Sequence, residues 1–558
     1  MWKMPIGIDD FQKIRDEHYY FVDKTDFIRR LIDEHSAVTL ITRPRRFGKT
    51  LTMSMLEWFF SIEKEEQSRH LFDGLAVEQA GAEYMAHRGQ YPVIFLSLKD
   101  IKNPAWPSWE RMLSFLRLFL AKFYNKYRYI RKEADNNDIQ AVVFDHIVQG
   151  KATEDELVLS LSNLMDMMQQ YYGKKVILLI DEYDAPIQQA WESGYYTGCI
   201  GFMRQFLSSA LKTNDTLDFA VLTGVTRISK ESIFSGLNNL DVCTVMSEMY
   251  SDVMGFTPRE VEKMAAAMDA ADCLPAIREW YDGYHFGRCE IYNPWSVVHY
   301  FRDRKVGDYW VNTSDNAILR LLLANADAQR AKTLQGLLSG EAVRVSLNEQ
   351  VVYHELKQDK SALYTMLLTT GYLTAVAQER RNRYVLQIPN REVKDAYCRE
   401  ILNHLAPSVN QDTFDDLFDA LFSGASEDFS RELQHIIAQV VSVYDAANKE
   451  SFYHGFMLGL TALFLDSSYT VESNRESGYG RFDLAIFPKE TDKAGVIMEF
   501  KVAASENEMK EKAQEALQQI EDREYITEFQ KRGIKEVWKY GIAFCGKKVC
   551  VAKGSEEQ

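Results

Sequence analysis

The feature that most constrains the fold of this chain is a short apolar segment that runs directly into a Gly-Lys-Thr turn. Residues 37–44 read AVTLITRP, the turn falls at residues 48–50, and residues 51–62 read LTMSMLEWFFSI. The first run favours a buried strand and the last one a helix. Strand, glycine-containing turn and helix in this order predict a phosphate-binding loop, because backbone amides and the helix N-terminus face the turn.

The loop itself reads RPRRFGKT over residues 43–50 and departs from the usual G-x-x-x-x-G-K-[ST] pattern in one place. Arg43 stands where the first glycine is expected, and its role is left open. Gly48 allows the backbone to approach phosphate, Lys49 reaches the β- and γ-phosphates, and Thr50 supplies a hydroxyl ligand to Mg²⁺. The segment therefore predicts a site for ATP and Mg²⁺.

A second apolar run, VILLI at residues 176–180, ends in the two carboxylates of Asp181 and Glu182. This is the form of a Walker B motif, in which Asp181 holds Mg²⁺ and Glu182 polarises the attacking water as a general base. The alternative is a buried strand that ends in a DEYD turn, with Asp184 as a turn residue. The phosphate loop upstream favours the Walker B interpretation.

A third apolar run, FAVLTGV at residues 219–225, also ends in polar residues. Thr223 is the candidate that senses the γ-phosphate of ATP. Arg227 contacts phosphate, in its own chain or across a homo-oligomer interface, or is a surface arginine at a turn. Arg45 and Arg46 leave two similar interpretations open, phosphate contact or exposure to solvent.

Strand-like and helical segments alternate through the first part of the chain. Further strand-like runs at residues 91–98, 175–180 and 219–225 are separated by stretches of helical periodicity, and this alternation predicts an α/β fold with a parallel sheet. We expect three domains: a P-loop ATPase domain at residues 1–245, a mainly helical middle domain at 246–445 and a small α/β domain at 446–558.

The last domain places two carboxylates and a lysine on neighbouring strand-like runs. Asp483 begins the run FDLAIF, and Glu499 and Lys501 share one face of the run GVIMEFKV. If the two strands pair as a hairpin, Asp483 comes close to Glu499. Carboxylates that bind Mg²⁺ or Mn²⁺ beside a lysine suit phosphodiester cleavage, and D followed by E-x-K is the PD-(D/E)XK pattern. The pattern is short, so a chance surface hairpin is the alternative.

Two flanking segments of helical character add further candidates to this site. Glu450 is a candidate third metal ligand, or a residue that hydrogen-bonds the metal ligands without touching the metal. Gln519 is a candidate to hold the attacking group in position. His454, close to Glu450, is more often a structural histidine than a ligand.

Longer segments of the sequence contain these motifs or lie between and after them. They read RPRRFGKTL, YYFVDKT (19–25), YPVIFLSLKD, LLIDEYDAP, TGVTRISKESIFSGLNNL, WYDGYHFG (280–287), YNPWS (292–296) and YWVNTS (309–314). Together they resemble the bacterial AAA-ATPase-like family, whose members usually carry a PD-(D/E)XK domain. The resemblance implies a P-loop fold with an additional strand, of the ASCE type, and an arginine-rich loop as the normal form.

Three of these segments are assigned a base-contact or a packing role. Tyr20 or Val22 in YYFVDKT would pack on the adenine base, although aromatic core anchoring is the more common role of such a cluster. For WYDGYHFG and YNPWS we expect turns and packing, because glycine and proline punctuate them and their aromatic residues fill a core.

Charge and hydropathy exclude some classes of protein. A formal net charge of −16 argues against a basic coat for nonspecific DNA binding, and residues 450–558 hold 15 Lys and Arg against 19 Asp and Glu. Contact with nucleic acid must therefore be local. No apolar run of about 18 residues and no signal-peptide pattern occur, so we expect a cytoplasmic protein without membrane contact. The seven scattered cysteines are expected to be reduced thiols.

The expected function is that of an ATP-binding and ATP-hydrolysing protein whose nucleotide state regulates a Mg²⁺-dependent nuclease acting on DNA, with RNA the less favoured substrate. The alternative is a nucleotide-dependent switch or scaffold that binds a nucleic-acid or protein partner without cleaving it. A third interpretation is a peptide-binding ATPase with an inert C-terminal domain.

Overall fold

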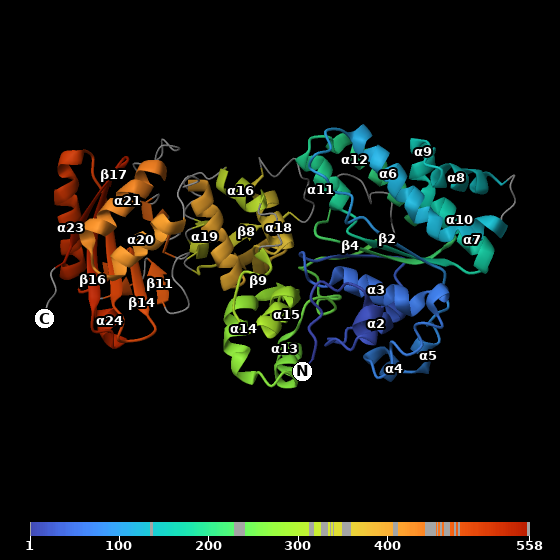
Figure 1. Ribbon diagram of the computed structural model, residues 1–558, viewed down its shortest axis with the longest axis horizontal. Helices are drawn as coiled ribbons and strands as arrows, with labels where there is room; N and C mark the ends of the chain where they lie inside the picture. The colour runs from blue at the N-terminus through green and yellow to red at the C-terminus, as the bar shows by residue number, and fades with distance from the viewer. Residues whose placement is uncertain are drawn as a thin grey trace. The chain divides into compact units, whose positions relative to one another are not determined.

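The fold is described from a computed structural model of the chain (Figure 1). The structure describes residues 2–133, 138–227, 240–311, 317–324, 333–334, 336–338, 340–348, 359–405, 411–440, 453–454, 456–457, 460–461, 469–473, 476–477 and 480–554.

The chain divides into two compact units. The first combines residues 1–314 with 344–392, and the second combines 315–343 with 393–558. The division into three domains that the sequence suggests stays a prediction.

The first unit is built on a parallel five-stranded sheet. Its strand order is β2-β3-β4-β1-β5, and every neighbouring pair is parallel. The sheet confirms the expected α/β architecture, although β5 was not anticipated. The strands are β1 (Val38–Thr42), β2 (Val93–Ser97), β3 (Val176–Asp181), β4 (Leu217–Gly224) and β5 (Leu240–Cys243).

The register brings the carboxyl ends of the central strands to one edge of the sheet. Thr42 at the end of β1 lies beside Gly224 on β4, and Ser97 at the end of β2 lies beside Asp181 on β3. The segments that follow these strands therefore meet at this edge, as parallel strands require.

Helices cover both faces of this sheet, with α2 to α5 on one side and α6 to α12 on the other (Figure 1). On the first side lie α1 (Phe11–Asp16), α2 (Asp26–Glu34), α3 (Lys49–Phe60), α4 (Ala76–Ala80) and α5 (Ala82–Met85). On the other lie α6 (Trp109–Tyr124), α7 (Arg128–Glu133), α8 (Ile139–Val148), α9 (Glu154–Val158), α10 (Ser160–Tyr172), α11 (Ala185–Glu192) and α12 (Tyr196–Leu211).

The remainder of the first unit combines helices with two small sheets. A β6–β7 hairpin (Tyr284–Phe286 and Cys289–Ile291) follows α13 (Pro258–Ala267) and α14 (Leu274–Tyr281). Helix α15 (Pro294–Asp303) begins where the Asn293 side chain accepts hydrogen bonds from the amides of Trp295 and Ser296, a standard N-cap. Next come β8 (Val343–Ser346), α18 (Lys360–Thr370), β9 (Thr374–Arg380) and β10 (Arg383–Gln387), with the strands ordered β8-β10-β9.

Gly283 in the segment WYDGYHFG has a clear steric role. Its φ is +91°, and a Cβ atom there would lie 2.0 Å from the carbonyl oxygen of Pro389. Only glycine therefore lets the β6–β7 hairpin lie directly against the segment that leads into α19 (Arg391–Leu405).

The second unit has a mixed five-stranded sheet in the order β11-β14-β15-β16-β17. Only the β15–β16 pair is parallel. The strands are β11 (Tyr469–Ser473), β14 (Leu484–Pro488), β15 (Gly495–Val502), β16 (Val537–Cys545) and β17 (Lys548–Lys553), and β12 (Glu476–Ser477) pairs separately with β13 (Gly480–Arg481).

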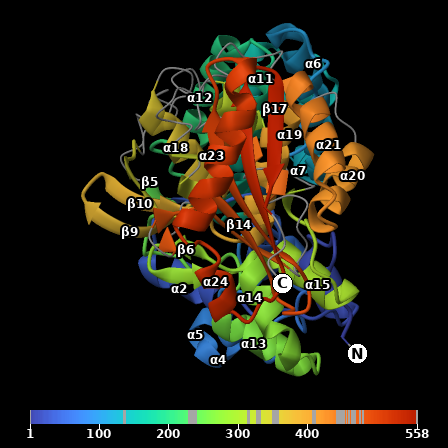
Figure 2. The same ribbon diagram turned by 90° about the vertical axis from the view of Figure 1, so that its left-hand side faces the viewer.

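Helices pack on both faces of this second sheet. On β16, Gly541 faces α23 (Met509–Asp522), and the neighbouring Tyr540 packs against Phe429 and bonds the carbonyl of Leu421 on the opposite face. Figure 2 shows α23 beside the strands, apart from α20 and α21. The unit's helices also include α16 (Ala317–Ala324), α20 (Gln411–Phe422), α21 (Ser426–Val440) and α24 (Thr527–Lys531).

Among the helices that the structure describes, none has the length and apolar character needed to cross a membrane.

Candidate functional site

The phosphate loop connects β1 to α3 at the carboxyl edge of the first sheet. Gly48 adopts φ +87° and precedes the first residue of α3, so its left-handed backbone makes the turn into the helix. The Lys49 ammonium group donates to the carbonyl oxygens of Arg43 (3.0 Å) and Pro44 (2.8 Å). Burial lowers the pKa of Lys49, and the carboxylates of Glu182, Asp181 and Asp184 oppose that shift. These two hydrogen bonds thus hold the Lys49 side chain against the backbone of the phosphate loop.

Asp181 joins the phosphate loop to the ends of β3 and β4. Its Oδ2 accepts a hydrogen bond from the Thr50 hydroxyl at 2.7 Å, and its Oδ1 accepts one from the Thr223 hydroxyl at 2.5 Å. Asp181 is fully buried, and burial raises its pKa although the two hydroxyls favour the ionised form. Three residues predicted from three separate motifs therefore meet at one carboxylate.

Glu182 follows Asp181 with its backbone in the left-handed region, at φ +53°. Its Oε2 lies 3.4 Å from the Lys102 ammonium nitrogen. Burial alone would raise the pKa of Glu182, but the positive charges of Lys102, Lys49 and Arg45 outweigh it, and the pKa is lowered. Glu182 is therefore held as a carboxylate, the form that accepts a proton from water.

Asp184 has a structural role. Its Oδ2 accepts hydrogen bonds from the amides of Val225 (2.9 Å) and Thr226 (2.8 Å) and from the Thr226 hydroxyl (3.0 Å). The turn interpretation of DEYD thus describes Asp184, while Asp181 belongs to the group around the phosphate loop.

Arg43 is a buried anchor of the loop. Its guanidinium group donates to the carbonyl oxygens of Thr42, Cys243 and Tyr250 at 2.7–3.0 Å and lies over the Phe286 ring. Burial lowers the pKa of Arg43 to about 10. The arginine that stands in place of the first glycine therefore bonds backbone carbonyls.

The other three candidate arginines differ in exposure. Arg45 is half-buried and donates to Oε1 of Gln188 at 3.0 Å, while Arg46 is exposed and lies over the Trp295 ring, 4.2 Å from its centroid. Arg227 lies half-buried beyond β4. Phosphate contact by any of the three stays a prediction.

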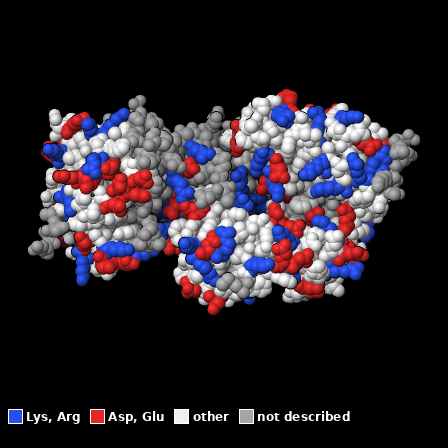
Figure 3. Space-filling view, viewed as in Figure 1, with Lys and Arg blue, Asp and Glu red and all other residues white. Residues whose placement is uncertain are grey.

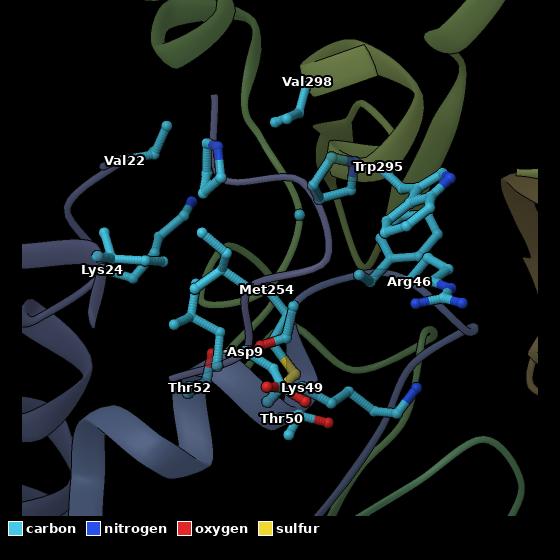
Figure 4. A pocket seen from close by; sticks show the side chains of 18 of the residues that line it. Asp9, Val22, Lys24, Arg46, Lys49, Thr50, Thr52, Met254, Trp295 and Val298 are labelled. Carbon is cyan, nitrogen blue, oxygen red and sulfur yellow. Dashed lines mark hydrogen bonds between the residues drawn. The ribbon is translucent and has the colours of Figure 1, made fainter. Parts of the chain in front are cut away.

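A cavity of about 470 Å³ opens beside the phosphate loop. Figure 4 shows Lys49 and Thr50 at one end of it, with Val22 and Val298 at the other. Lysine, arginine and hydroxyl groups line the loop end, and the lining also includes the apolar Ile6, Ile8, Tyr20, Phe21, Val22, Met254, Phe256 and Val298. Lys24 lies beside Val22 (Figure 4), so this end has apolar side chains and one cation. A pocket with charged groups at the loop and apolar side chains farther away suits a nucleotide, and it includes the Tyr20 and Val22 proposed to contact the base.

The second candidate site lies in the second unit, where β14 and β15 pair antiparallel as predicted. Leu484 lies opposite Met498, so Asp483 and Glu499 meet beyond that pair, and the Asp483 amide is 3.3 Å from Oε2 of Glu499. Lys501 reaches Oε1 of Glu499 at 3.7 Å, and the Gln519 amide of α23 donates to the same oxygen. The Lys501 and Gln519 side chains and the Asp483 backbone amide therefore contact the buried Glu499 carboxylate.

Asp483 is held through both its carboxylate and its backbone carbonyl. Its Oδ2 accepts the Phe500 amide at 2.7 Å, and its carbonyl oxygen lies 2.8 Å from Nε2 of His454. Burial raises the pKa of Asp483, and the Phe500 amide, His454 and Lys501 oppose that shift. His454 thus has the structural role that the sequence favoured. Glu450 lies outside the described residues.

Comparisons with known proteins match the two units separately. Residues 5–234 match the AAA-ATPase-like family, described as a predicted AAA-ATPase, and residues 448–554 match the PD-(D/E)XK nuclease superfamily. The chain is thus similar to the first family in its N-terminal part and to the second in its C-terminal part. An uncharacterized protein in the vnfD 5' region of Azotobacter chroococcum mcd 1 is 28% identical over 556 residues, which cover 95% of this chain and 94% of that protein.

Among solved structures, the Walker-type ATPase PABY2304 of Pyrococcus abyssi aligns with a TM-score of 0.37 and 15% identity, over 69% of this chain and 97% of that chain.

The donor atoms of both domains suit a divalent cation. In the AAA-ATPase-like domain, the Thr50 hydroxyl and the buried Asp181 carboxylate already lie 2.7 Å apart, and hard oxygen donors of this kind hold Mg²⁺. In the PD-(D/E)XK domain, the oxygen donors are Asp483 and Glu499. Within the described part of the chain, no group of three or more His, Cys, Asp or Glu side chains forms a metal site.

The PD-(D/E)XK domain is bordered by an acidic surface on α20 and α21. Acidic side chains gather there on the face shown in Figure 3. The exposed residues are Asp412, Asp415, Asp416, Asp419, Glu427 and Asp428. Phosphate backbones would be repelled from this surface.

Sequence analysis missed several residues around the phosphate loop. Lys102 follows β2, and since carboxyl ends of parallel strands share one edge, its place in the sequence could have pointed to Glu182. Trp295 and Trp310, which contact the loop, lie in segments that were assigned only packing or no role.

Proposed function

We propose that the AAA-ATPase-like domain binds and hydrolyses ATP with Mg²⁺ in the cavity beside the phosphate loop. Thr50 and Asp181 would hold the cation, which offsets negative charge on the β- and γ-phosphates when bound. Lys49 would leave the carbonyls of its own loop for phosphate oxygens. Glu182 would accept a proton from the attacking water, and Thr223 would respond to the γ-phosphate through Asp181.

One observation carries this proposal: Asp181 accepts hydrogen bonds from both Thr50 and Thr223, beside the ionised Glu182 and the buried Lys49. A DEYD turn without chemistry would not need a buried carboxylate between two hydroxyls, one of which belongs to Thr50 in the cavity lining.

ATP turnover by the purified full-length protein tests the proposal. Lys49→Ala should abolish ATP binding, and Glu182→Gln should preserve binding but lower turnover by about 100-fold or more, because the water loses its proton acceptor. Ser162→Ala, at a half-buried position on α10 outside the cavity lining, is the control for general damage. ATP turnover that persists in both Lys49→Ala and Glu182→Gln would disprove the proposal.

We further propose that the PD-(D/E)XK domain is a nuclease that uses Mg²⁺ or Mn²⁺ and acts on DNA, in the cytoplasm. Asp483 and Glu499 would hold the metal, Lys501 would stabilise charge at the attacking water, and Gln519 would fix the orientation of Glu499. All seven cysteines are free thiols, in keeping with a reducing compartment.

Cleavage of plasmid and single-stranded DNA in Mg²⁺ or Mn²⁺, with and without ATP, tests the second proposal. Glu499→Ala should abolish cleavage, and Lys501→Ala should reduce it strongly. If nucleotide state regulates the nuclease, Lys49→Ala should remove the effect of ATP while Glu499→Ala leaves ATP turnover intact. Cleavage that persists in Glu499→Ala belongs to a contaminant or to another site, and counts against the assignment.

A second candidate function is a nucleotide-dependent switch that binds its partner without cleaving it. The acidic surface on α20 and α21 favours it, because this surface would repel a phosphate backbone. Salt-dependent DNA binding without cleavage in either metal would support this alternative.

A further inference from the structure

The phosphate loop of this chain carries large side chains where such loops are usually glycine-rich. Between Thr42 and Gly48 it reads Arg-Pro-Arg-Arg-Phe, and each of these side chains needs a place in the fold. Phe47 is completely buried, with its ring 5.1 Å from that of Tyr284 and 5.3 Å from that of Phe286. The loop is therefore shaped by distant parts of the first unit as well as by its own backbone.

Two tryptophans hold the consecutive residues Arg45 and Arg46. The Trp310 indole Nε1 donates to the carbonyl oxygen of Arg45 at 2.9 Å, and the Trp295 ring lies under the Arg46 guanidinium at 4.2 Å. Figure 4 shows Trp295 and Arg46 together at the wall of the cavity. Arg46 has a φ of +67°, a backbone conformation that is costly for a side chain with a Cβ atom and that needs such support.

One buried carboxyl group, that of Glu392, bonds Trp310 itself and the residue next to Trp295. Its Oε1 accepts the Trp310 amide at 2.6 Å, and its Oε2 accepts the hydroxyl of Ser296, the residue next to Trp295, at 2.8 Å. Glu392 and Ser296 have no exposed surface, and Trp310 is 1% exposed. The group is thus enclosed, and each of its oxygens serves one of the two tryptophan-bearing segments.

Glu392 is also the last residue of the first unit and the second residue of α19, through which the chain continues into the second unit. A change in the shape of the phosphate loop would therefore act on the first turn of that helix through Trp310 and Trp295.

We propose that Glu392 is a positioning residue for the nucleotide site, acting through Trp310 on Arg45 and through Ser296 and Trp295 on Arg46. The three residues Glu392, Trp295 and Trp310 form a clamp that holds the phosphate loop in the shape that receives ATP. This inference rests on the proposed ATP site and adds to it the segments YNPWS and YWVNTS. The clamp lowers the ordering cost of binding, since a loop already held in its bound shape loses less freedom.

The affinity of the full-length protein for a fluorescent ATP analogue, measured in Mg²⁺ by anisotropy, tests the clamp. Trp310→Phe keeps the ring beside Tyr372 but removes the bond to Arg45, and we expect about fivefold weaker binding. Glu392→Ala removes two hydrogen bonds and should weaken binding by about tenfold or more. Glu392→Gln should rescue most of this loss, because its amide accepts from Trp310 and donates to Ser296.

A merely structural role makes a different prediction. Asn163→Ala removes a buried hydrogen bond on α10, away from the cavity lining, and should lower the melting temperature without changing affinity. Glu392→Ala should change affinity beyond that control at temperatures where both variants are folded. If Glu392→Ala fails to fold, the cycle of Trp295→Ala and Arg46→Ala decides, because the clamp requires their effects on affinity to be non-additive.

The outcomes separate the clamp from the ATP site itself. No binding by the wild-type protein, or binding that survives Lys49→Ala, overturns the proposed ATP site. Wild-type binding that requires Lys49 but is unchanged in Trp310→Phe and Glu392→Ala, or additive effects in the Trp295 and Arg46 cycle, overturns the clamp alone.

Discussion

Arg43 is a case in which a buried charge has replaced the residue that the motif expects. Its three bonded carbonyls, those of Thr42, Cys243 and Tyr250, would be left without partners in Arg43→Gly. We therefore expect this variant to lose about 3 kcal/mol or more of unfolding free energy, although it restores the usual loop sequence. Urea unfolding measures the loss. Arg69→Ala, at an exposed position, should change it by less than about 0.5 kcal/mol. Equal stability of the wild type and Arg43→Gly would contradict the anchoring role.

Glu392 predicts a pH dependence of stability. Burial raises its pKa to about 8, with Ser296 and the Trp310 amide opposing the shift. Because the folded protein binds this proton more tightly than the unfolded chain, the stabilisation is complete below the unfolded pKa and is lost as pH rises toward 8. Glu392→Gln does not titrate. The stability of the wild type relative to this variant should therefore fall between about pH 5 and pH 8, as melting temperatures at several pH values would show. A difference independent of pH would argue against the buried proton.

At the scale of elements, α23 packs closely against β16 in the second unit. A Cβ atom at Gly541 would lie 2.2 Å from the carbonyl oxygen of Ala513 and 2.4 Å from the amide of Leu517, both backbone atoms that cannot rotate away. Gly541→Ala should therefore destabilise the second unit by about 2–3 kcal/mol, as overpacking does. Gly201→Ala, inside α12 with free space around the added atom, should be neutral or slightly stabilising. Denaturant unfolding compares the two, and a tolerated Gly541→Ala would show that α23 can shift.

The strands that carry the sites could be predicted because each is a buried apolar run that ends in a functional residue. β3 reads VILLID and is buried throughout, and β15 reads GVIMEFKV, with Glu499 and Lys501 two residues apart. β5 was not predicted because the strand has only four residues, LDVC, and most of them are half-buried. Its sequence therefore shows no buried apolar run. A local sequence pattern therefore predicts a strand when all residues of that strand are buried.

The partners of the phosphate loop could not be predicted in the same way. Lys49, Thr50 and Asp181 follow motifs with fixed spacing, and the structure brings them together. Trp310 and Glu392 are more than 250 residues from the loop. Trp310 contacts the loop and Glu392 bonds Trp310, and both contacts depend on tertiary packing that no local spacing encodes. The sequence therefore predicted the residues proposed to act on the nucleotide, but not the residues that hold the phosphate loop in place.

At the scale of the whole molecule, the two compact units predict how nucleotide should alter unfolding. ATP bound at about 100 times its dissociation constant should stabilise the first unit by about 2.7 kcal/mol and leave the second unit unchanged. Calorimetry with Mg²⁺ and a non-hydrolysable ATP analogue should then show one transition moving upward and one fixed. Lys49→Ala should abolish the movement. A single transition that shifts as a whole would mean that the two units unfold together.

The first unit is discontinuous in sequence, because the chain leaves it after residue 314 and returns from 344 to 392. During synthesis, β1 and the phosphate loop leave the ribosome early, but the last residue of their support, Glu392, is made much later. At about 5–20 residues per second, the 350 residues between Thr42 and Glu392 take roughly 20–70 s. Until residue 392 is made, Trp310 and Ser296 lack the Glu392 carboxyl group to which they donate, although the partners of Arg43 and Phe47 are already present. Nucleotide binding should therefore appear on the ribosome only after residue 392 has emerged, and shorter fragments that end at the expected boundary of residue 245 should depend on chaperones.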